Sequence, residues 1–380
     1  MQIIWITIAI LLLPIKMLAD VLTDKVGFSY EYYSDNTDTE INSPTFSFVK
    51  TLGEKLAISF KERIDAITAA SIKTAGPSGV TNNVILDAVT GASSSHGYDD
   101  LRYATTANLQ YLGDDLSSSI GVYHSTERDY IAKAIFGSLS YSFNEANSVA
   151  SILVSSSNDK WIPAFARALT TNKRKEKRLD LSFTQLISPD ISLQLIYNRI
   201  ENSGYLNSPY HYLIQNNFST FEKVPTEKNA NAYTLKAVLA LNDENSLWGS
   251  YRYYKDSWEV DAHTLELQGF HDINENTTIG LRLRYYNQNK ANFFKNIADY
   301  TSNDKYIGVD YRLSDFKSYT AGLSLHYNPQ FELLGIDLEK ASIKAGINYY
   351  KTSKNENIAY WYNVDYLRAF YSTFSLEYEF

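Results

Sequence analysis

Residues 262–288 read AHTLELQGFHDINENTTIGLRLRYYNQ, and this stretch decides the fold. On both sides of the polar run from Asp272 to Asn276, apolar and polar residues alternate with a period of two. Leu265 and Leu267 share one face of the first segment, while charged and amide residues occupy the other face. Such alternation predicts two half-buried strands, and the polar run between them predicts an antiparallel hairpin.

The same unit recurs from Val26 to the end of the chain. About ten alternating residues, a short polar turn and about ten more residues are followed by a longer connection, which is the spacing of barrel hairpins. An even number of strands is what a closed bacterial barrel requires. About sixteen candidate strands begin near Val26, Ser43, Lys55, Leu101, Leu116, Ile131, Ser148, Arg178, Ile191, Ala232, Ser246, Ala262, Thr277, Ser318, Ala341 and Ala369.

The connections fall into two alternating classes. The tight turns are residues 52–54, 112–115, 144–147, 188–190, 242–245 and 272–276. The longer connections are residues 66–100, 159–177, 202–231, 288–317 and 352–368. Because outer-membrane barrels have short periplasmic turns and long extracellular loops, we expect an all-β, antiparallel transmembrane barrel of about 16 strands.

Composition excludes several classes of protein. The 380 residues include no Cys, which excludes disulfide scaffolds, thiolate zinc sites and cysteine nucleophiles. The net charge of -8 argues against a nucleic-acid partner, because phosphate binding needs a basic surface. The 31 Tyr and 18 Phe favour strands.

The N-terminus predicts export. Residues 3–13 form an apolar core that is followed by Pro14, Lys16 and the small residue Ala19. We interpret residues 1–19 as a signal peptide and residues 20–380 as the barrel, which places the protein in the bacterial outer membrane. The core lacks a preceding Lys or Arg, and a membrane-retained anchor is the alternative.

Aromatic residues gather near the ends of the predicted strands. Residues 30–33, 251–254, 285–286 and 349–350 are rich in tyrosine, and we expect them to form the outer aromatic girdle at the membrane interface. At the C-terminus, one strand face predicts a signal for the barrel-assembly machinery. Its residues are Phe374, Leu376, Tyr378 and Phe380.

Several segments resemble a bacterial outer-membrane family that is catalogued as domain-of-unknown-function family 3570. They run in family order across most of the chain after the leader. The resemblance implies a barrel of undetermined function and supplies no catalytic residues. The segments are residues 87–93, 204–210, 251–258, 262–267, 284–288 and 310–314.

Strand parity places charged residues of both signs on the inner face. The run Arg252, Arg282 and Arg284 on neighbouring strands would favour an anion, because rings of charged side chains set the selectivity of pores. Alternatively, charges of opposite sign pair across the lumen and stiffen the wall. The candidate lumen residues are Arg252, Glu266, Arg282, Arg284, Lys344, Lys61 and Arg63.

A short repeat lies in the first long connection, at residues 65–71 and 87–93. Asp and Thr side chains bond nearby backbone N–H groups, so Asp65, Thr68, Asp87 and Thr90 predict a loop that is folded on itself. Two alternatives stay open: a plug inserted into the lumen, and a divalent cation site. The cation ligands would be Asp65, Asp87, Asp99 and Asp100.

Nothing in the sequence predicts an enzyme or a cofactor. It has no glycine-rich phosphate loop and no zinc-binding His-Glu motif. His263, near Ser250 and Glu266, is the best candidate base, but strand parity turns His263 toward lipid.

Two functions follow from the fold. The first is a passive, porin-like channel for small polar solutes, narrowed by loops that fold inward. The second is a structural or surface-interaction barrel with a plugged lumen, whose best candidate segment for binding a partner is residues 202–231. The expected partners are outer-membrane lipid, the barrel-assembly machinery and small polar solutes, and the sequence does not identify the surface partner that the second function requires.

Overall fold

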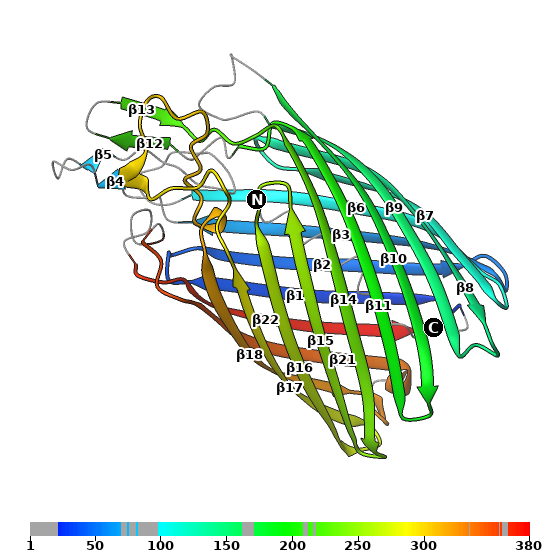
Figure 1. Ribbon diagram of the computed structural model, residues 1–380. Helices are drawn as coiled ribbons and strands as arrows, with labels where there is room; N and C mark the ends of the chain where they lie inside the picture. Colours follow the sequence, from blue (N-terminus) through cyan, green and yellow to red (C-terminus); the bar gives the residue numbers. More distant parts are fainter. Residues whose placement is uncertain are drawn as a thin grey trace.

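The protein is described by a computed structural model in which sixteen antiparallel strands close into one barrel (Figure 1). Among the described residues no helix has the length and apolarity needed to cross a membrane. The structure describes residues 22–69, 74–75, 81–82, 98–161, 171–207, 212–215, 218–333, 335–356, 358 and 364–380. The predicted signal peptide, residues 1–19, lies outside them.

Each of the sixteen predicted strands is present. The barrel strands are, in spatial order, β1 (Lys25–Asp35), β2 (Glu40–Thr51), β3 (Leu56–Ala69), β6 (Tyr98–Leu112), β7 (Leu116–Thr126), β8 (Tyr130–Phe143), β9 (Ser148–Trp161), β10 (Asn172–Ser188), β11 (Ile191–Gly204), β14 (Glu227–Asn242), β15 (Asn245–Asp256), β16 (Asp261–Asn274), β17 (Thr277–Gln288), β18 (Phe316–Tyr327), β21 (Ala341–Thr352) and β22 (Arg368–Glu379).

The barrel closes because the first strand pairs with the last. β1 and β22 are antiparallel neighbours along their whole length, from Lys25 opposite Glu379 to Asp35 opposite Ala369. Closure leaves no open sheet edge. A wall of this kind satisfies its backbone N–H and C=O groups internally, which is the condition for spanning hydrocarbon.

The outer wall of the barrel is apolar. In the hairpin of residues 262–288, Leu267 of β16 lies opposite Leu283 of β17, and both point outward with 45% and 48% of their surface exposed. Similar exposed Leu, Ile, Val and Phe side chains occur on the other strands of the barrel. A continuous band of exposed apolar side chains would be costly in water, so its natural environment is lipid.

The two ends of the barrel differ, as predicted. Tight turns such as Asp243-Glu244 and Glu275-Asn276 lie at the end that holds the C-terminus, and the longer loops lie at the opposite end (Figure 1). Following the sequence-based assignment, we refer to these as the turn end and the loop end. The loop end carries two small hairpins, β4–β5 (Thr74–Ala75, Thr81–Asn82) and β12–β13 (Tyr212–Gln215, Phe218–Phe221).

The alternation of short and long connections is less strict than predicted. At the turn end, residues 328–340 form a longer connection that contains β19 (Glu332–Leu333), β20 (Ile336–Asp337) and the 3-10 turn η4 (Leu338–Lys340). At the loop end, residues 36–39, 127–129 and 257–260 are short. Strand pairing requires only that a connection span neighbouring strands, so its length can vary at either end.

Several strands are longer than the sequence indicated. β10 starts at Asn172 rather than near Arg178, and β14 starts at Glu227 rather than near Ala232. In these extensions both faces are polar, so the alternation that marks a strand is lost. The backbone ladder nevertheless continues there, as the pairing of Lys173 with Lys160 shows.

Candidate functional site

The inner face of β14 to β17 carries an excess of positive charge. Lys236 of β14, Arg252 of β15, and Arg282 and Arg284 of β17 face the lumen, and we call these four residues the cationic wall. Cross-strand register brings them together, because Lys236 lies opposite Ser250, Ser250 opposite Glu266, and Glu266 opposite Arg284. Sequence parity placed Arg252, Arg282 and Arg284 on the inner face of neighbouring strands. In the structure all three face the lumen, but β16 lies between Arg252 of β15 and the two arginines of β17.

One carboxylate lies within this cluster. Glu266 Oε2 is 2.7 Å from Arg282 Nη2 and 3.9 Å from Arg284 Nε. Gln268 Nε2 also donates to Glu266 Oε1, at 2.5 Å. Arg282 Nη1 donates to the Tyr371 hydroxyl of β22, at 3.2 Å, so its side chain reaches past β18 and β21. Glu266 thus compensates only part of the charge.

The other two cations face aromatic rings. The Arg252 guanidinium carbon is 5.6 Å from the centre of the Tyr254 ring, and Lys236 Nζ is 4.7 Å from the Trp248 ring. Within the described part of the chain, neither side chain has a carboxylate oxygen within 4.0 Å. Among the described residues, Glu266 is the carboxylate that lies close to Arg282 and Arg284 of this wall.

The opposite wall has paired charges. Asp65 of β3, which is 2% exposed, accepts from Arg63 Nε at 2.7 Å and from Arg102 Nε at 2.5 Å. Ser43 Oγ donates to the same carboxylate, and Arg63 Nη1 donates to Glu31 at 2.8 Å. Charges of opposite sign thus pair on β1, β3 and β6, as the alternative interpretation of the lumen charges expected.

This arrangement corrects the interpretation of the early repeat. Asp65 and Thr68 belong to strand β3 rather than to a folded loop, because β3 continues to Ala69. Asp65 is also no cation ligand, since two guanidinium groups already occupy its carboxylate. Asp87 and Thr90 lie outside the described residues.

Two predicted lumen residues lie apart from the cationic wall. Lys61 is on the inner face of β3, two positions before Arg63. Lys344 is on β21, opposite His326, and lies nearer the turn end than Arg282. The predicted lumen set is therefore distributed around the barrel rather than gathered into a single ring.

The tyrosine clusters do not form one outer girdle. Tyr251 points outward and is 46% exposed, as the prediction required, and Tyr319, which lies outside the predicted segments, is also outward and 53% exposed. Tyr254 and Tyr286 point inward, and the Arg284 guanidinium carbon is 5.5 Å from the Tyr286 ring. Adjacent residues of a strand face opposite sides of the sheet, so a pair such as Tyr285-Tyr286 must divide between lipid and lumen.

Two loops cover part of the opening at the loop end. Residues 205–226 and residues 289–315, which we call the mouth loops, contribute buried apolar side chains to two clusters. The first cluster packs against the inward residues of β8 and β9, namely Tyr130, Ala132 and Trp161; its loop residues are Leu213, Ile297, Tyr300, Ile307 and Val309. The second packs near β15 and contains Val224, Trp258, Val260, Ala291, Phe294 and Leu313.

These two anchoring walls are not neighbours. β10, β11 and β14 lie between β9 and β15 in the order of the barrel. The described residues of the mouth loops therefore pack against two separate parts of the wall at the loop end. Residues 202–231, the segment predicted to bind a surface partner, bury Leu213 and Val224 in the described part of the segment.

Direct contacts lock the mouth loops to each other. Lys223 and Ile307 form a β-bridge, with N···O distances of 2.9 and 2.7 Å. Glu222, which is 4% exposed, accepts from the backbone N–H groups of Val309 at 3.2 Å and Asp310 at 3.3 Å. A buried carboxylate bonded in this way fixes one loop against the other.

The second mouth loop also has an internal framework. The Tyr300 hydroxyl donates to Gly308 O at 2.9 Å and accepts from the N–H groups of Lys295 and Gly308, and burial raises its pKa. Asp304 accepts from Lys295 Nζ and from the Thr301 N–H, and these contacts lower the pKa of its carboxyl.

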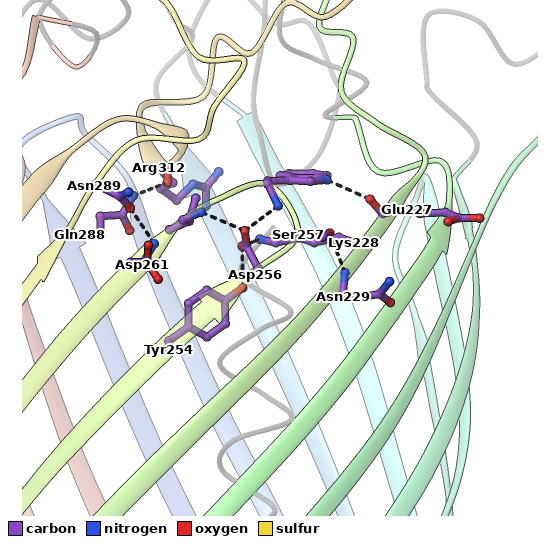
Figure 2. A network of polar contacts seen from close by, with 12 residues as sticks. Glu227, Lys228, Asn229, Tyr254, Asp256, Ser257, Asp261, Gln288, Asn289 and Arg312 are labelled. Atoms are coloured by element: carbon purple, nitrogen blue, oxygen red, sulfur yellow. Dashed lines mark hydrogen bonds and ion pairs between the residues drawn. The ribbon is translucent and has the colours of Figure 1, made fainter.

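Polar contacts at the loop end of β15, β16 and β17 order the β15–β16 turn and join the second mouth loop to the barrel. Figure 2 shows the Asp256 carboxylate accepting from the Tyr254 hydroxyl and from the backbone N–H groups of the turn that follows. Lys228 Nζ lies 2.9 Å from the same carboxylate. Gln288 donates to Arg312 O at 2.9 Å, which ties the second mouth loop to β17 (Figure 2).

Sequence reasoning missed the apolar clusters of the mouth loops. The sequence predicted long polar connections. Apolar residues within such a connection do not alternate regularly, so no pattern identifies them as buried. The apolar pair Phe293-Phe294 was the one sequence feature that could have indicated a buried cluster in the second loop.

His263 lies where strand parity placed it, on the outer face. Its Nδ1 is 2.7 Å from the Tyr251 hydroxyl, and it points away from the inward-facing Ser250 and Glu266.

Comparison with known proteins identifies a family and a fold. The family model described as "Protein of unknown function (DUF3570)" matches residues 12–168 and 156–375. No curated protein matches the chain. A bacterial polysaccharide outer membrane secretin is similar in structure at a TM-score of 0.50 and 6% identity, with 95% of this chain and 100% of that chain covered.

Further solved structures are more distant. OccAB1 from Acinetobacter baumannii has a TM-score of 0.48 at 12% identity, with 94% and 96% of the two chains covered. The siderophore receptor PirA from Pseudomonas aeruginosa has a TM-score of 0.44 at 9% identity; the match covers 89% of this chain but only 57% of the receptor. At these identities the likeness shows an outer-membrane-type barrel fold alone.

The Asp65 cluster predicts a sharp loss of stability on neutralisation. In the variant Asp65→Asn, the buried Arg102 and the partly buried Arg63 lose their shared anion, and we expect the free energy of unfolding to fall by about 3–5 kcal/mol. Urea titration of the refolded barrel in detergent measures this. Asp114→Asn, whose carboxylate is 91% exposed beside Lys55, is the control and should unfold like the parent. Equal midpoints for Asp65→Asn and the parent would show that the cluster is not structural.

Proposed function

Because the chain belongs to the family described as "Protein of unknown function (DUF3570)", whose description assigns no activity, we propose from its own structure that it is an outer-membrane channel. It allows small polar solutes to diffuse passively and favours anions. The cationic wall is the observation that carries this proposal. Barrels of about sixteen strands usually enclose an aqueous passage, whereas barrels of eight strands are filled by side chains.

The wall suits an anion for electrostatic reasons. Charged side chains lining a pore raise the local concentration of the opposite ion. Arg252 and Lys236 have no carboxylate partner among the described residues, and Arg282 Nε is buried without an acceptor there. An anion passing along the wall would meet the positive charges of Arg252 and Lys236, which have no carboxylate partner among the described residues.

Placement in the outer membrane is part of the proposal. The apolar outer band and the closed ladder support it, together with the match to the family. On β22, Phe374 and Leu376 are 42% and 38% exposed on the outer face, and Phe380, directly after the strand, is 54% exposed. This face, with Tyr378, would be the strand that the barrel-assembly machinery reads, after removal of residues 1–19 as a signal peptide.

One observation favours a second candidate. The buried clusters of the mouth loops and the Glu222 contacts resemble a fixed cover more than a mobile one. If the cover extends over the whole opening, the protein is a structural or surface-interaction barrel with a plugged lumen. Single-channel recording in planar bilayers separates the two: stepwise currents support the channel, and a folded barrel without currents supports the plugged form.

Charge reversal on the cationic wall tests anion preference. In Arg282→Glu combined with Arg284→Glu, three carboxylates would face Lys236 and Arg252, so we expect the ratio of anion to cation permeability to invert. Reversal potentials in a salt gradient measure it. The control, Lys317→Glu with Lys351→Glu, makes the same change in net charge at outward positions and should keep the parent ratio. An unchanged ratio in the arginine variant would refute the assignment of the selectivity site.

Loosening the mouth loops tests their part in narrowing the channel. Glu222→Ala removes the carboxylate that accepts from Val309 and Asp310, and we expect larger or more frequent current steps than in the parent. Glu227→Ala, at an exposed rim position, is the control. If Glu222→Ala conducts like the parent while folding normally, the mouth loops do not limit the passage.

A further inference from the structure

A group of five lysines lies on the outer face of the barrel near the loop end. It consists of Lys133 of β8, Lys160 of β9, and Lys173, Lys175 and Lys177 of β10, all of which are exposed. We call this group the lysine patch. It belongs neither to the lumen nor to the mouth loops, and it is prominent in a protein whose net charge is -8.

Strand register brings these lysines together. Lys160 lies directly opposite Lys173, and Asn158 separates Lys133 from Lys175 in one cross-strand row. Lys177 follows on the same face, opposite Ser156. Like charges directly across a sheet repel each other and destabilise the pairing. A bound anion would offset this repulsion.

The patch borders the apolar band. Along β10 the outward positions after Lys177 are Leu179, Leu181 and Phe183, and the last two are 41% and 40% exposed. The alternate residues Arg174, Arg178 and Asp180 are buried and point inward. The lysines therefore stand immediately beyond the hydrocarbon level on the loop-end side, which is the height of lipid headgroups.

A hollow in the apolar wall begins below the patch. It is lined by side chains of β2, β3, β6, β7 and β8, and Ile135 at its margin is the next outward residue after Lys133 on β8. Val122, Ile120 and Leu109 continue the lining. A molecule with acyl chains in this hollow would hold its headgroup beside Lys133.

The positive charge of the patch is not neutralised from within the described part of the protein. None of its five ammonium groups lies within 4.0 Å of a carboxylate among the described residues. The flanking acid, Glu201, is opposite Lys177 but pairs with Arg199 at 3.2 Å. Glu176 faces inward and pairs with Arg174.

We propose that the lysine patch binds the phosphate groups of phosphorylated glycolipids in the outer leaflet of the membrane. Ammonium groups bind phosphate as point charges, and each lysine near an anionic lipid surface strengthens binding roughly fivefold. The lipid is the expected source of the phosphate because the patch adjoins the apolar wall, where the acyl chains pack. The inference rests on the membrane placement of the barrel and is independent of conduction.

The test compares two forms of one glycolipid on the intact mature barrel. Diphosphoryl lipid A and its dephosphorylated form are titrated in nonionic detergent, and binding is followed by native mass spectrometry. We expect the phosphorylated form to bind at least roughly tenfold more tightly. The triple variant Lys160→Gln, Lys173→Gln and Lys175→Gln should lose most of this difference.

A matched control variant removes the same number of positive charges at a site away from the lysine patch. Lys25→Gln, Lys55→Gln and Lys340→Gln remove three positive charges at the turn end and should leave glycolipid binding unchanged. Heat-modifiable migration on a gel confirms that each variant is folded. If the triple variant does not fold, the single variant Lys173→Gln is used instead. We expect it to lose part of the preference for the phosphorylated glycolipid.

Three results would overturn the proposal. They are equal binding of the dephosphorylated form, full binding by the folded triple variant, and complete displacement of the glycolipid by millimolar inorganic phosphate, which would indicate a site for soluble anions. A silent bilayer recording would refute the channel and leave these results unaffected, so the two proposals fail separately.

Discussion

The structure depends on the need to pair every backbone N–H and C=O group where no water is available. A sheet meets this need only when its first and last strands join, as β1 and β22 do. Once the ladder is closed, neighbouring strands supply the hydrogen-bond partners of the backbone, and no side chain is needed for this purpose. The outer face can then be uniformly apolar and the inner face can hold charges, as Leu283 and Arg284 illustrate within one strand.

The inner face uses this freedom in two ways. On β3 and its neighbours, Asp65 joins Arg63 and Arg102 in a buried, compensated cluster that braces the wall. On β14 to β17, Glu266 compensates only part of the cationic wall. Among the described residues, the same residue types are thus paired with carboxylates on one side of the lumen and largely unpaired on the other. Cross-strand register decides which residues meet.

The features that follow from the two-residue alternation, namely the strands and the direction of their side chains, were predicted from the sequence. All sixteen strands were recognised, and the parity of residues 262–288 placed Leu267 outside and Arg282 inside correctly. Features that depend on contacts between distant segments were missed. The packing of Leu213 against Val309 and the role of Asp65 arise from segments far apart in the chain. Charged extensions such as Lys173 to Lys177 look like loop because both faces are polar, although the ladder continues through them.

In a barrel of this kind, neighbouring residues of each strand face hydrocarbon and water in turn. The chain has no Cys, so single cysteines can report on this directly. Cysteines at positions 281, 282, 283 and 284 of the barrel refolded in liposomes would be treated with a charged, water-soluble thiol reagent. We expect reaction at 282 and 284 and protection at 281 and 283. Uniform reaction at all four positions, or the reverse pattern, would refute the membrane-spanning barrel.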